Sequence, residues 1–281
     1  MNGTLYLCAT PIGNLGDVSS RCIEVLNSVD LIAAEDTRRT IQLLNHFGIS
    51  KPLTSYHEHN KREKGEYIIS LLKKGKNIAQ VSDAGTPAIS DPGEDLVKLC
   101  IENEIDITSI PGPVAGINAL ILSGLPTRRF SFEGFLSVNK RHRSDHLNSL
   151  KSDTHTLIFY EAPHKLRTTL SDMAAVFGGG RKIALVRELT KLHEEVIRTT
   201  LAESLAIYEE KSPRGEYVLV IEGASDSDET STEAWWDTLS VSEHVEKYIG
   251  DGMTQKEAVK QTATDRGCPK REIYNEYHGI V

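Results

Sequence analysis

The chain of 281 residues is long enough for two domains, and its 39% hydrophobic and 26% charged residues are typical of a globular protein and argue against disorder. Its formal net charge of −8 argues against an unselective nucleic-acid coat, because counterion release needs clustered Lys and Arg. The four cysteines form no C-x-x-C pair, so we expect no disulfide framework and no zinc site. No basic leader and no run of about 18 apolar residues occurs, so we expect a cytoplasmic protein without a membrane span.

Short apolar runs alternate with stretches of helical period over residues 1–126. This alternation is typical of parallel βαβ units and predicts an α/β domain with an open, mostly parallel sheet. We expect strands at 4–10, 31–36, 53–57, 77–83 and 106–112, and helices at 19–29, 37–48, 61–75 and 93–104. The apolar segment 111–126 predicts a further helix that ends this first domain.

Residues 127–224 predict a second α/β domain with a mixed sheet. The expected strands are 130–136, 154–162, 182–189, 194–203 and 215–223, with helices such as 164–178 between some of them. Residues 225–232 are acidic and rich in Ser and Thr, which predicts a linker.

Residues 233–281 predict a small helical module that resembles a helix-turn-helix in spacing. Thr254 is the expected N-cap of one of its two or three helices, with Glu257 three residues on. Six Lys and Arg against nine Asp and Glu give the module a net charge of −3, which argues against DNA recognition. A packing module at a subunit contact is the favoured interpretation.

The segment VSDAGTPAISDPG, residues 81–93, follows an expected strand and contains no Lys or Arg. It matches neither the triphosphate loop G-x-x-x-x-G-K-[ST] nor the dinucleotide loop G-x-G-x-x-G. Asp83 and Asp91 would repel phosphate, so this loop indicates a ligand that is uncharged or cationic where it touches the protein. The loops TPIGNLGD, EDTRRT, SYHEHN and PGPVAG also follow expected strands, and ligands bind at that edge of an open parallel sheet.

A basic run occupies residues 128–143 and has a local net charge of +4, with Glu133 opposing Arg128, Arg129, Lys140, Arg141 and Arg143. Two interpretations stay open at this point: a local RNA contact and a solvated loop beside a strand.

Several long segments resemble the hallmark segments of the ribosomal RNA methylating branch of the tetrapyrrole (corrin/porphyrin) methylase family. They are LYLCATPIGNLGD, AAEDTRRT, YHEHN, VSDAGTPAISDPG, PGPVAG, FYEAPHKL and RELTKLHEE, and the resemblance covers about residues 3–223. It implies two α/β domains with S-adenosylmethionine bound between them, and usually a homodimer. The implied activity is 2′-O-methylation of a cytidine in the decoding centre of 16S rRNA, within the small ribosomal subunit.

S-adenosylmethionine carries a sulfonium cation and no phosphate, so an acidic Gly-rich loop without Lys suits it. The resemblance places cofactor contacts in both halves of the chain, at Pro11, Asp83, Ala84, Gly85, Thr86, Pro87, Ala115, Phe159, Tyr160, Glu161, Leu189, Thr190, Glu216 and Tyr217. Taken alone, Phe159 and Tyr160 would more commonly be plain strand core.

A base that removes the ribose hydroxyl proton could add roughly 10²- to 10⁴-fold to methyl transfer. The candidates are Glu35, Asp36, His57 and His59, with Lys191 as an outsider. Structural alternatives stay open, since Asp36 can cap the following helix or pair with a neighbouring Arg, and His57 can be an ordinary strand-end histidine.

By the same resemblance, RNA phosphates would meet Arg38, Arg39, Lys61 and Arg62, with Lys140, Arg141 and Arg143 on the second domain. No metal is expected, because no metal ligands occur at the usual spacing. Two other functions stay open: the same fold acting on a tetrapyrrole, and an RNA-binding or assembly protein without catalysis. Basic and His-rich loops disfavour the first, and an intact cofactor loop disfavours the second.

Overall fold

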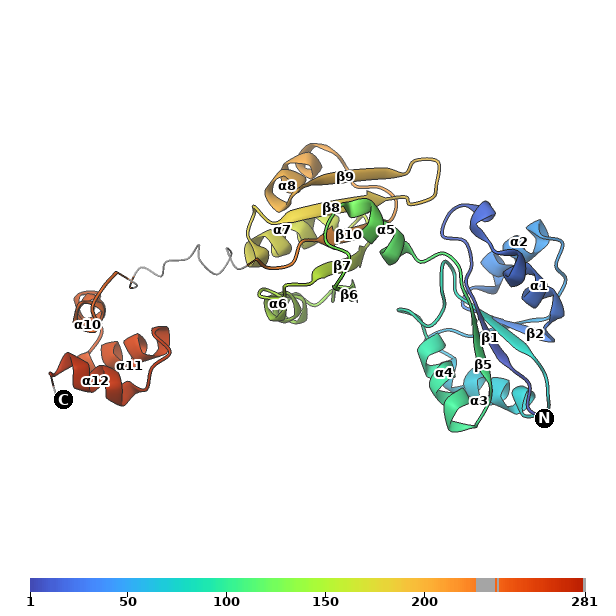
Figure 1. The fold of residues 1–281 in the computed structure, drawn as a ribbon, viewed down its shortest axis with the longest axis horizontal. Coiled ribbons are helices and arrows are strands. Elements are labelled where there is room, and N and C mark those ends of the chain that lie inside the picture. Colours follow the sequence, from blue (N-terminus) through green and yellow to red (C-terminus); the bar gives the residue numbers. More distant parts are fainter. Residues whose placement is uncertain (226–235, 237, 280–281) are drawn as a thin grey trace. The chain divides into compact units, whose positions relative to one another are not determined.

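The computed structural model describes residues 1–225, 236 and 238–279. The chain separates into two compact units, residues 1–224 and 225–281. The first unit contains two five-stranded sheets, and the described part of the second consists of helices (Figure 1). The expected linker 225–232 lies, apart from Ser225, outside the described residues.

The first sheet is entirely parallel and has the strand order β3-β2-β4-β1-β5. Each strand falls inside an expected strand, so the predicted open parallel sheet is confirmed. Its strands are β1 (Leu5–Cys8), β2 (Leu31–Ala34), β3 (Leu53–Ser55), β4 (Ile78–Val81) and β5 (Ile107–Ile110).

Helices cover both faces of this sheet because its strands are apolar on both sides. Leu31 and Ile78 pack toward α3 (Lys61–Leu72) and α4 (Gly93–Glu102), whereas Ile32 and Ala79 pack toward α1 (Ser20–Ser28) and α2 (Thr37–His46) (Figure 1). A short 3₁₀ helix, η1 (Leu15–Asp17), precedes α1. The adjacent strands β1 and β4 therefore lead to helices on opposite faces, and a crevice opens where their carboxyl ends diverge.

The second sheet is mixed, as predicted, with the order β6-β7-β10-β8-β9. The pair β6 and β7 is parallel and the other pairs are antiparallel. The strand expected at 194–203 ends at Thr200, because Thr200 and Glu203 form a capping box that begins α8 (Leu201–Glu210). The strands are β6 (Phe130–Phe135), β7 (Thr156–Glu161), β8 (Lys182–Arg187), β9 (Glu195–Thr200) and β10 (Tyr217–Ile221).

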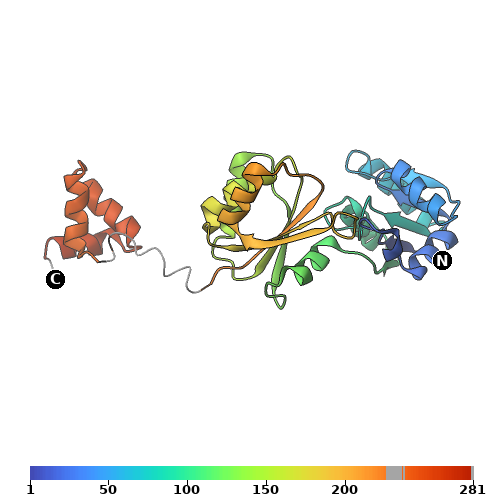
Figure 2. The same ribbon diagram turned by 90° about the horizontal axis from the view of Figure 1, so that it is seen from above.

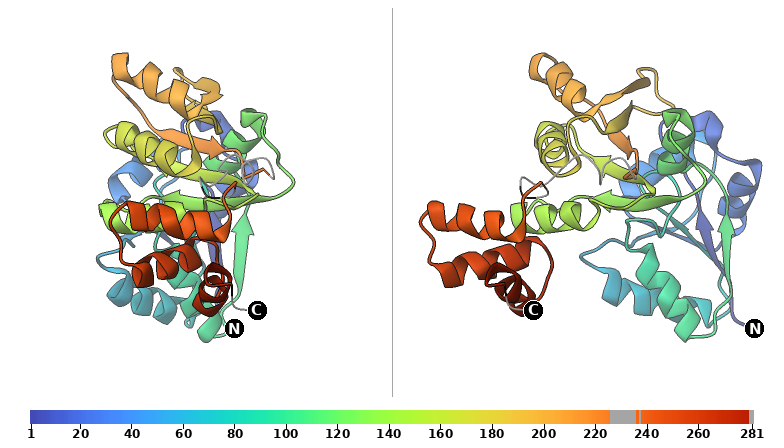
Figure 3. Two further views of the ribbon diagram at one scale, coloured as in Figure 1. Left: turned by 90° about the vertical axis from the view of Figure 1, so that its left-hand side faces the viewer. Right: turned by 60° about the vertical axis from the view of Figure 1, so that its left-hand side comes forward.

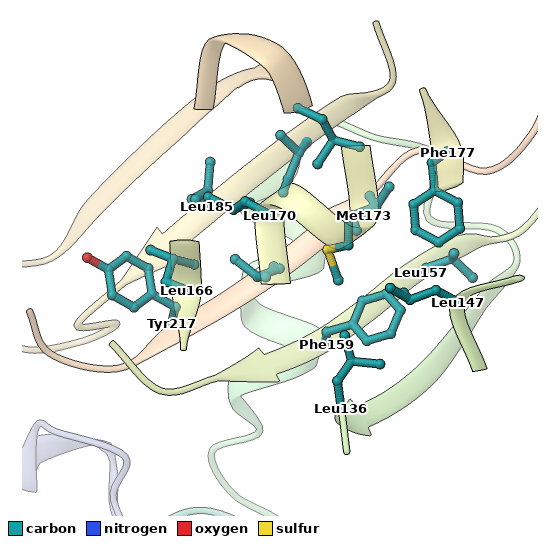
Figure 4. Close-up of a cluster of buried hydrophobic side chains, with 14 of the residues drawn as sticks. Leu136, Leu147, Leu157, Phe159, Leu166, Leu170, Met173, Phe177, Leu185 and Tyr217 are labelled. Atoms are coloured by element: carbon teal, nitrogen blue, oxygen red, sulfur yellow. The ribbon is translucent and has the colours of Figure 1, made fainter. Parts of the chain in front are cut away.

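One face of the second sheet is covered by α7 (Leu166–Phe177), α8 and α6 (Lys140–Ser149) (Figure 2). Phe159 lies in the core beneath them with Leu170 and Met173 (Figure 4). Helix α6 was not expected from the basic run. It begins because the Asn139 side chain accepts hydrogen bonds from the backbone of Arg141 and His142.

Helix α5 (Ala115–Ser123) covers the opposite face of the second sheet. Ala119 and Leu120 are buried there against Ile158, Val186 and Val218. The sequence places this helix at the end of the first domain, yet its apolar face packs on the second sheet. Helix α5 thus carries the chain from the end of β5 to the wall of the second sheet.

The second unit contains α10 (Val241–Gly250), α11 (Gln255–Asp265) and α12 (Lys270–Tyr277) (Figure 3). Val245, Val259 and Ile273 form its small apolar core. The expected cap is confirmed, since the Thr254 backbone and hydroxyl both donate to Glu257. Among the described residues, no helix is both long enough and apolar enough to cross a membrane.

Candidate functional site

A cavity of about 600 Å³ lies where the ends of the first sheet's strands approach the second sheet. The first sheet contributes the loops after β2 and β4, and α5 contributes Ala115. The second sheet contributes the ends of β7 and β8 and the start of β10. This volume lies in the usual range for a small-molecule site.

The loop after β4 is tied to the loop after β1 by two backbone hydrogen bonds. Thr10 N donates to Gly85 O at 2.9 Å, and Gly85 N donates to Thr10 O at 3.1 Å. Gly85 has a φ of +83°, and a Cβ there would lie 3.2 Å from the Ile12 side chain and 3.4 Å from the Pro113 carbonyl oxygen. Only glycine combines this positive φ with such close neighbours without strain. Gly85 therefore allows the loops after β1, β4 and β5 to meet at the cavity floor.

The same loop continues through two left-handed residues, Ala88 and Ser90, with φ values of +67° and +60°. Such conformations cost roughly 1–3 kcal/mol each and persist only where neighbours hold them. The Asp91 carboxylate does so by accepting hydrogen bonds from Ala88 N at 2.9 Å and Gly93 N at 2.7 Å. Burial raises the pKa of Asp91. The loop thereby presents Ile89, which is 42% exposed, at the cavity wall.

Glu35, Asp83 and Arg39 form a charged cluster at the cavity. Asp83 pairs with Arg39 at 3.1 Å and accepts a hydrogen bond from Asp36 N at 3.0 Å. The Glu35 carboxylate accepts from Asp83 N at 3.4 Å. Burial, and next the charge of Asp83, raise the pKa of Glu35 above its ordinary value. A carboxyl group with a raised pKa in a cavity is a candidate for proton transfer.

The other expected bases lie elsewhere. Asp36 caps α2 by accepting from Arg38 N at 2.9 Å, and it pairs with the Arg38 side chain. The hydrogen bonds from Arg38 keep the pKa of Asp36 low. His57 and His59 follow the edge strand β3 with their rings 6.0 Å apart, and neither lines the cavity. The structure therefore brings Glu35 to the cavity and leaves the remaining three candidates outside it.

Lys191 lines the cavity, where it bridges Glu188 at 2.9 Å and Glu216 at 2.8 Å. Burial opposes its charge, but the two carboxylates outweigh burial and raise the pKa of Lys191. A lysine held in its protonated form is a poor base, so this arrangement favours Glu35 over Lys191.

Most of the expected cofactor residues line the cavity, namely Asp83, Ala84, Gly85, Thr86, Ala115, Tyr160, Glu161, Leu189, Glu216 and Tyr217. Pro11 instead lines a smaller neighbouring hollow, and Pro87 lines neither. Thr190 lies beside the cavity wall, and its hydroxyl is buried without a hydrogen-bond partner among the described residues. The Phe159 side chain packs in the core under α7, because alternate residues of a strand point to opposite faces and Tyr160 takes the cavity face.

The residues expected to contact RNA form two groups: exposed cations with little or no pairing, and cations already paired with a carboxylate. Arg141 is 89% exposed with one distant partner at 3.9 Å, and Lys140 and Arg62 are exposed. Arg143 is only 11% exposed and is bonded to Asp172 at 2.6 Å. Lys61 bridges Glu58 and Asp95, and Arg38 pairs with Asp36 at the start of α2. Arg39 pairs with Asp83 at the cavity.

Some cavity residues were not singled out from the sequence, among them Ile12, Ile89, Phe135, His164 and Glu188. Glu161, by contrast, was expected, and its carboxylate is used internally by Thr169 Oγ1 at 2.5 Å and Ala162 N at 2.8 Å. The sequence signal that could have pointed to Phe135 is Gly134, because a Gly within a strand often marks a bulge that redirects the residues after it.

The donor set of the cavity fits S-adenosylmethionine. Its carboxylates include Glu35, Asp83 and Asp91, whereas its cations Arg39 and Lys191 are already paired with carboxylates. An apolar wall from Tyr160, Val186 and Leu189 completes the cavity. A ligand with a cationic centre and an apolar ring suits this combination. Over the part of the chain that the structure describes, no group of three His, Cys, Asp or Glu could hold a metal ion.

This fold and site define a class of α/β protein that binds a small cationic ligand at the ends of a parallel sheet. The model of the family Tetrapyrrole (Corrin/Porphyrin) Methylases matches residues 4–205. The fold is shared with solved structures. One is uroporphyrin-III-C-methyltransferase of Thermus thermophilus, with a TM-score of 0.56 and 17% sequence identity, covering 78% of this chain and 94% of that chain. Another is diphthine synthase, with a TM-score of 0.60 and 14% sequence identity, covering 79% of this chain and 90% of that chain.

Curated relatives are much closer in sequence. The chain is 52% identical to "Ribosomal RNA small subunit methyltransferase I" of Halalkalibacterium halodurans, over 98% of this chain and 95% of that protein. It is 51% identical to the protein of the same name from Bacillus subtilis, over 98% of this chain and 94% of that protein. The chain belongs to the tetrapyrrole (corrin/porphyrin) methylase family and is an S-adenosylmethionine-dependent methyltransferase.

Proposed function

We propose that this enzyme methylates the ribose 2′-hydroxyl of a cytidine in the decoding centre of 16S rRNA. The observation that carries this proposal is the identity of 51–52% over nearly the whole chain to relatives named for the RNA of the small ribosomal subunit. Exposed cations such as Lys140 and Arg141 support an RNA substrate, because they are available to phosphates.

Glu35 is the proposed base. When bound, S-adenosylmethionine supplies an activated methyl group. Glu35 then accepts the proton of the attacking 2′-hydroxyl on its carboxylate, a task for which a raised pKa in a cavity is suited. Asp83, paired with Arg39 at the same rim, would hold the cationic part of the cofactor.

We further propose that residues 1–126 and 127–224 act as two domains, that residues 233–281 form a helical module, and that the enzyme is a homodimer. In this division the loops of the first domain hold the cofactor, and Lys140 and Arg141 of the second meet the RNA backbone. The Arg143 guanidinium is tied to Asp172 and would instead fix the start of α6.

The test is methyl transfer from labelled S-adenosylmethionine to small ribosomal subunits prepared from cells that lack the activity. The label is located by nuclease digestion and mass spectrometry. We expect it on the 2′-oxygen of one 16S cytidine, with naked 16S rRNA tested in parallel. Absence of label on both, together with measured cofactor binding, would contradict the proposal and direct attention to small-molecule acceptors.

A further inference from the structure

Strand β6 contains a bulge that redirects its last residue. Phe132 pairs with Ile158, but the next pairs are Gly134 with Phe159 and Phe135 with Tyr160, so Glu133 is an extra residue. Gly134 has a φ of +62°, a conformation that glycine adopts readily. In an uninterrupted strand, residues three apart point to opposite faces, so the bulge places Phe132 and Phe135 on the same face.

Ring contacts agree with this change of direction. The rings of Phe132 and Phe135 both meet the Tyr160 ring edge-on, with centroids 5.1 Å and 5.5 Å away. On the other face, Glu133 reaches His146 of α6 at 2.9 Å and Leu136 lies in the core with Phe159. The bulge therefore adds an aromatic ring to the cavity side without removing one from the core.

Phe135 is not packed as a core residue. It is 58% exposed, yet it lines the cavity. A large apolar side chain left open at a cavity wall indicates a ligand surface. The strained loop also lies against the bulge, because a Cβ on Gly134 would be 3.2 Å from Ser90 Oγ. Exposed Ile89, between the two left-handed residues, thus belongs to the same rim.

Positive charge lies close to Phe135 along the chain. Lys140 and Arg141 follow it by five and six residues, at the start of α6, and both are exposed. An exposed ring followed within a few residues by exposed cations suits a single-stranded nucleic acid, because bases stack on the ring and phosphates pair with cations further along the strand.

We propose that Phe135 is the stacking platform for the base of the nucleotide that is methylated. This inference rests on the proposed function. A ribose enters a cavity only when its nucleotide leaves its neighbours, and the unstacked base then needs a new surface. Phe135 supplies that surface, while Lys140 and Arg141 hold the adjoining backbone phosphates.

The experiment compares Phe135→Leu, which keeps an apolar side chain but removes the ring, with Phe135→Trp, which restores a ring. Phe130→Leu is the matched control, because Phe130 is also exposed on β6 but does not line the cavity. Each variant is tested for KM and kcat with small subunits and for S-adenosylmethionine Kd by calorimetry. We expect Phe135→Leu to raise the KM for subunits by about 5- to 100-fold, the range of base stacking on an aromatic ring.

The tryptophan variant should recover most of this loss, the control should behave as wild type, and the cofactor Kd should stay within about twofold. An RNA stem-loop with an abasic site at the mapped cytidine adds a second comparison. Wild type should bind the abasic RNA more weakly than the intact RNA, whereas Phe135→Leu should bind both equally. An unchanged KM, or a cofactor Kd that weakens as much as the KM, would overturn the inference. A wild-type enzyme that transfers no methyl group to subunits would overturn the proposed function and this inference with it.

Discussion

The two sheets of residues 1–224 contribute to one cavity in different ways. The parallel sheet supplies loops, because the carboxyl ends of its strands meet at one edge and deliver Glu35 and Asp83 there. The mixed sheet supplies a wall, because alternate strand residues such as Tyr160 face the cavity and Phe159 faces the core. The proposed base therefore comes from the first sheet and much of the apolar wall from the second, so each can be perturbed alone.

The largest effect is expected on kcat, from a substitution in the loops of the first sheet. Glu35→Gln keeps the size of the side chain but removes the base, so kcat should fall roughly 10²- to 10⁴-fold. The pKa of Glu35 is raised, and protonation removes the base form as the pH falls through that value. In wild type, the rate should therefore increase with pH through a midpoint above the ordinary range of glutamate. Steady-state kinetics from about pH 4 to about pH 8, which covers the ordinary glutamate pKa and the region above it, would reveal this midpoint.

Asp36→Asn is the matched control, since Asp36 neighbours Glu35 but serves as the cap of α2. Asn also caps helices, so kcat should stay near wild type. A large loss in this variant with little loss in Glu35→Gln would reverse the roles assigned to the two carboxylates.

Substitutions in the second sheet should lower the free energy of unfolding where the residue faces the core. Phe159→Ala removes a fully buried ring beneath α7 and should lower the free energy of unfolding by about 3–5 kcal/mol. Urea titration followed by circular dichroism measures this. A loss below about 1 kcal/mol, the size of an ordinary surface substitution, would place Phe159 outside the core.

Tyr160→Phe tests the next residue of the same strand with a smaller change. The Tyr160 hydroxyl accepts a hydrogen bond from Gly116 N at 3.1 Å, at the start of α5. Its removal leaves that amide without its partner and should cost about 1–3 kcal/mol of stability. Wild-type stability in this variant would show that water replaces the hydroxyl. Hydrogen exchange of the Gly116 amide would register the lost bond directly.

The smallest effect is expected on the basic surface. Arg141→Ala removes one exposed charge, so the slope of log K for RNA binding against log salt should decrease by about one. Arg143→Ala breaks a shielded pair with Asp172 and should instead lower stability. Filter binding over a salt series separates the two, and an equal change of slope in both variants would contradict the distinction.

The sequence alone predicted the parts of the site that depend on strand ends. Glu35, Asp83 and Gly85 lie within four residues of the ends of the apolar strands β2 and β4, so their position in a parallel sheet follows from topology. Which of Phe159 and Tyr160 faces the cavity depends on where α5 and α7 pack, and one strand does not encode that. Arg143 was assigned to RNA because its partner Asp172 lies 29 residues away in sequence.

The bulge in β6 was also not predicted, because it too depends on contacts between segments that are distant in sequence. Gly134 was visible in the sequence, but the change of direction at Phe135 depends on the register with β7. Helix α6 was missed because its ten residues have few apolar positions, whereas the Asn139 cap that begins it is a local signal that the sequence does contain.

The central claim is that the loop of the first sheet, through Asp83, holds a cationic cofactor. Calorimetry of S-adenosylmethionine binding to Asp83→Asn tests it most directly, since Asn keeps the shape and the acceptor for Asp36 N but loses the charge. The Kd should rise about 10- to 100-fold, as expected for the loss of a charged hydrogen bond, while Arg141→Ala keeps the wild-type Kd. An unchanged Kd in Asp83→Asn would contradict the account.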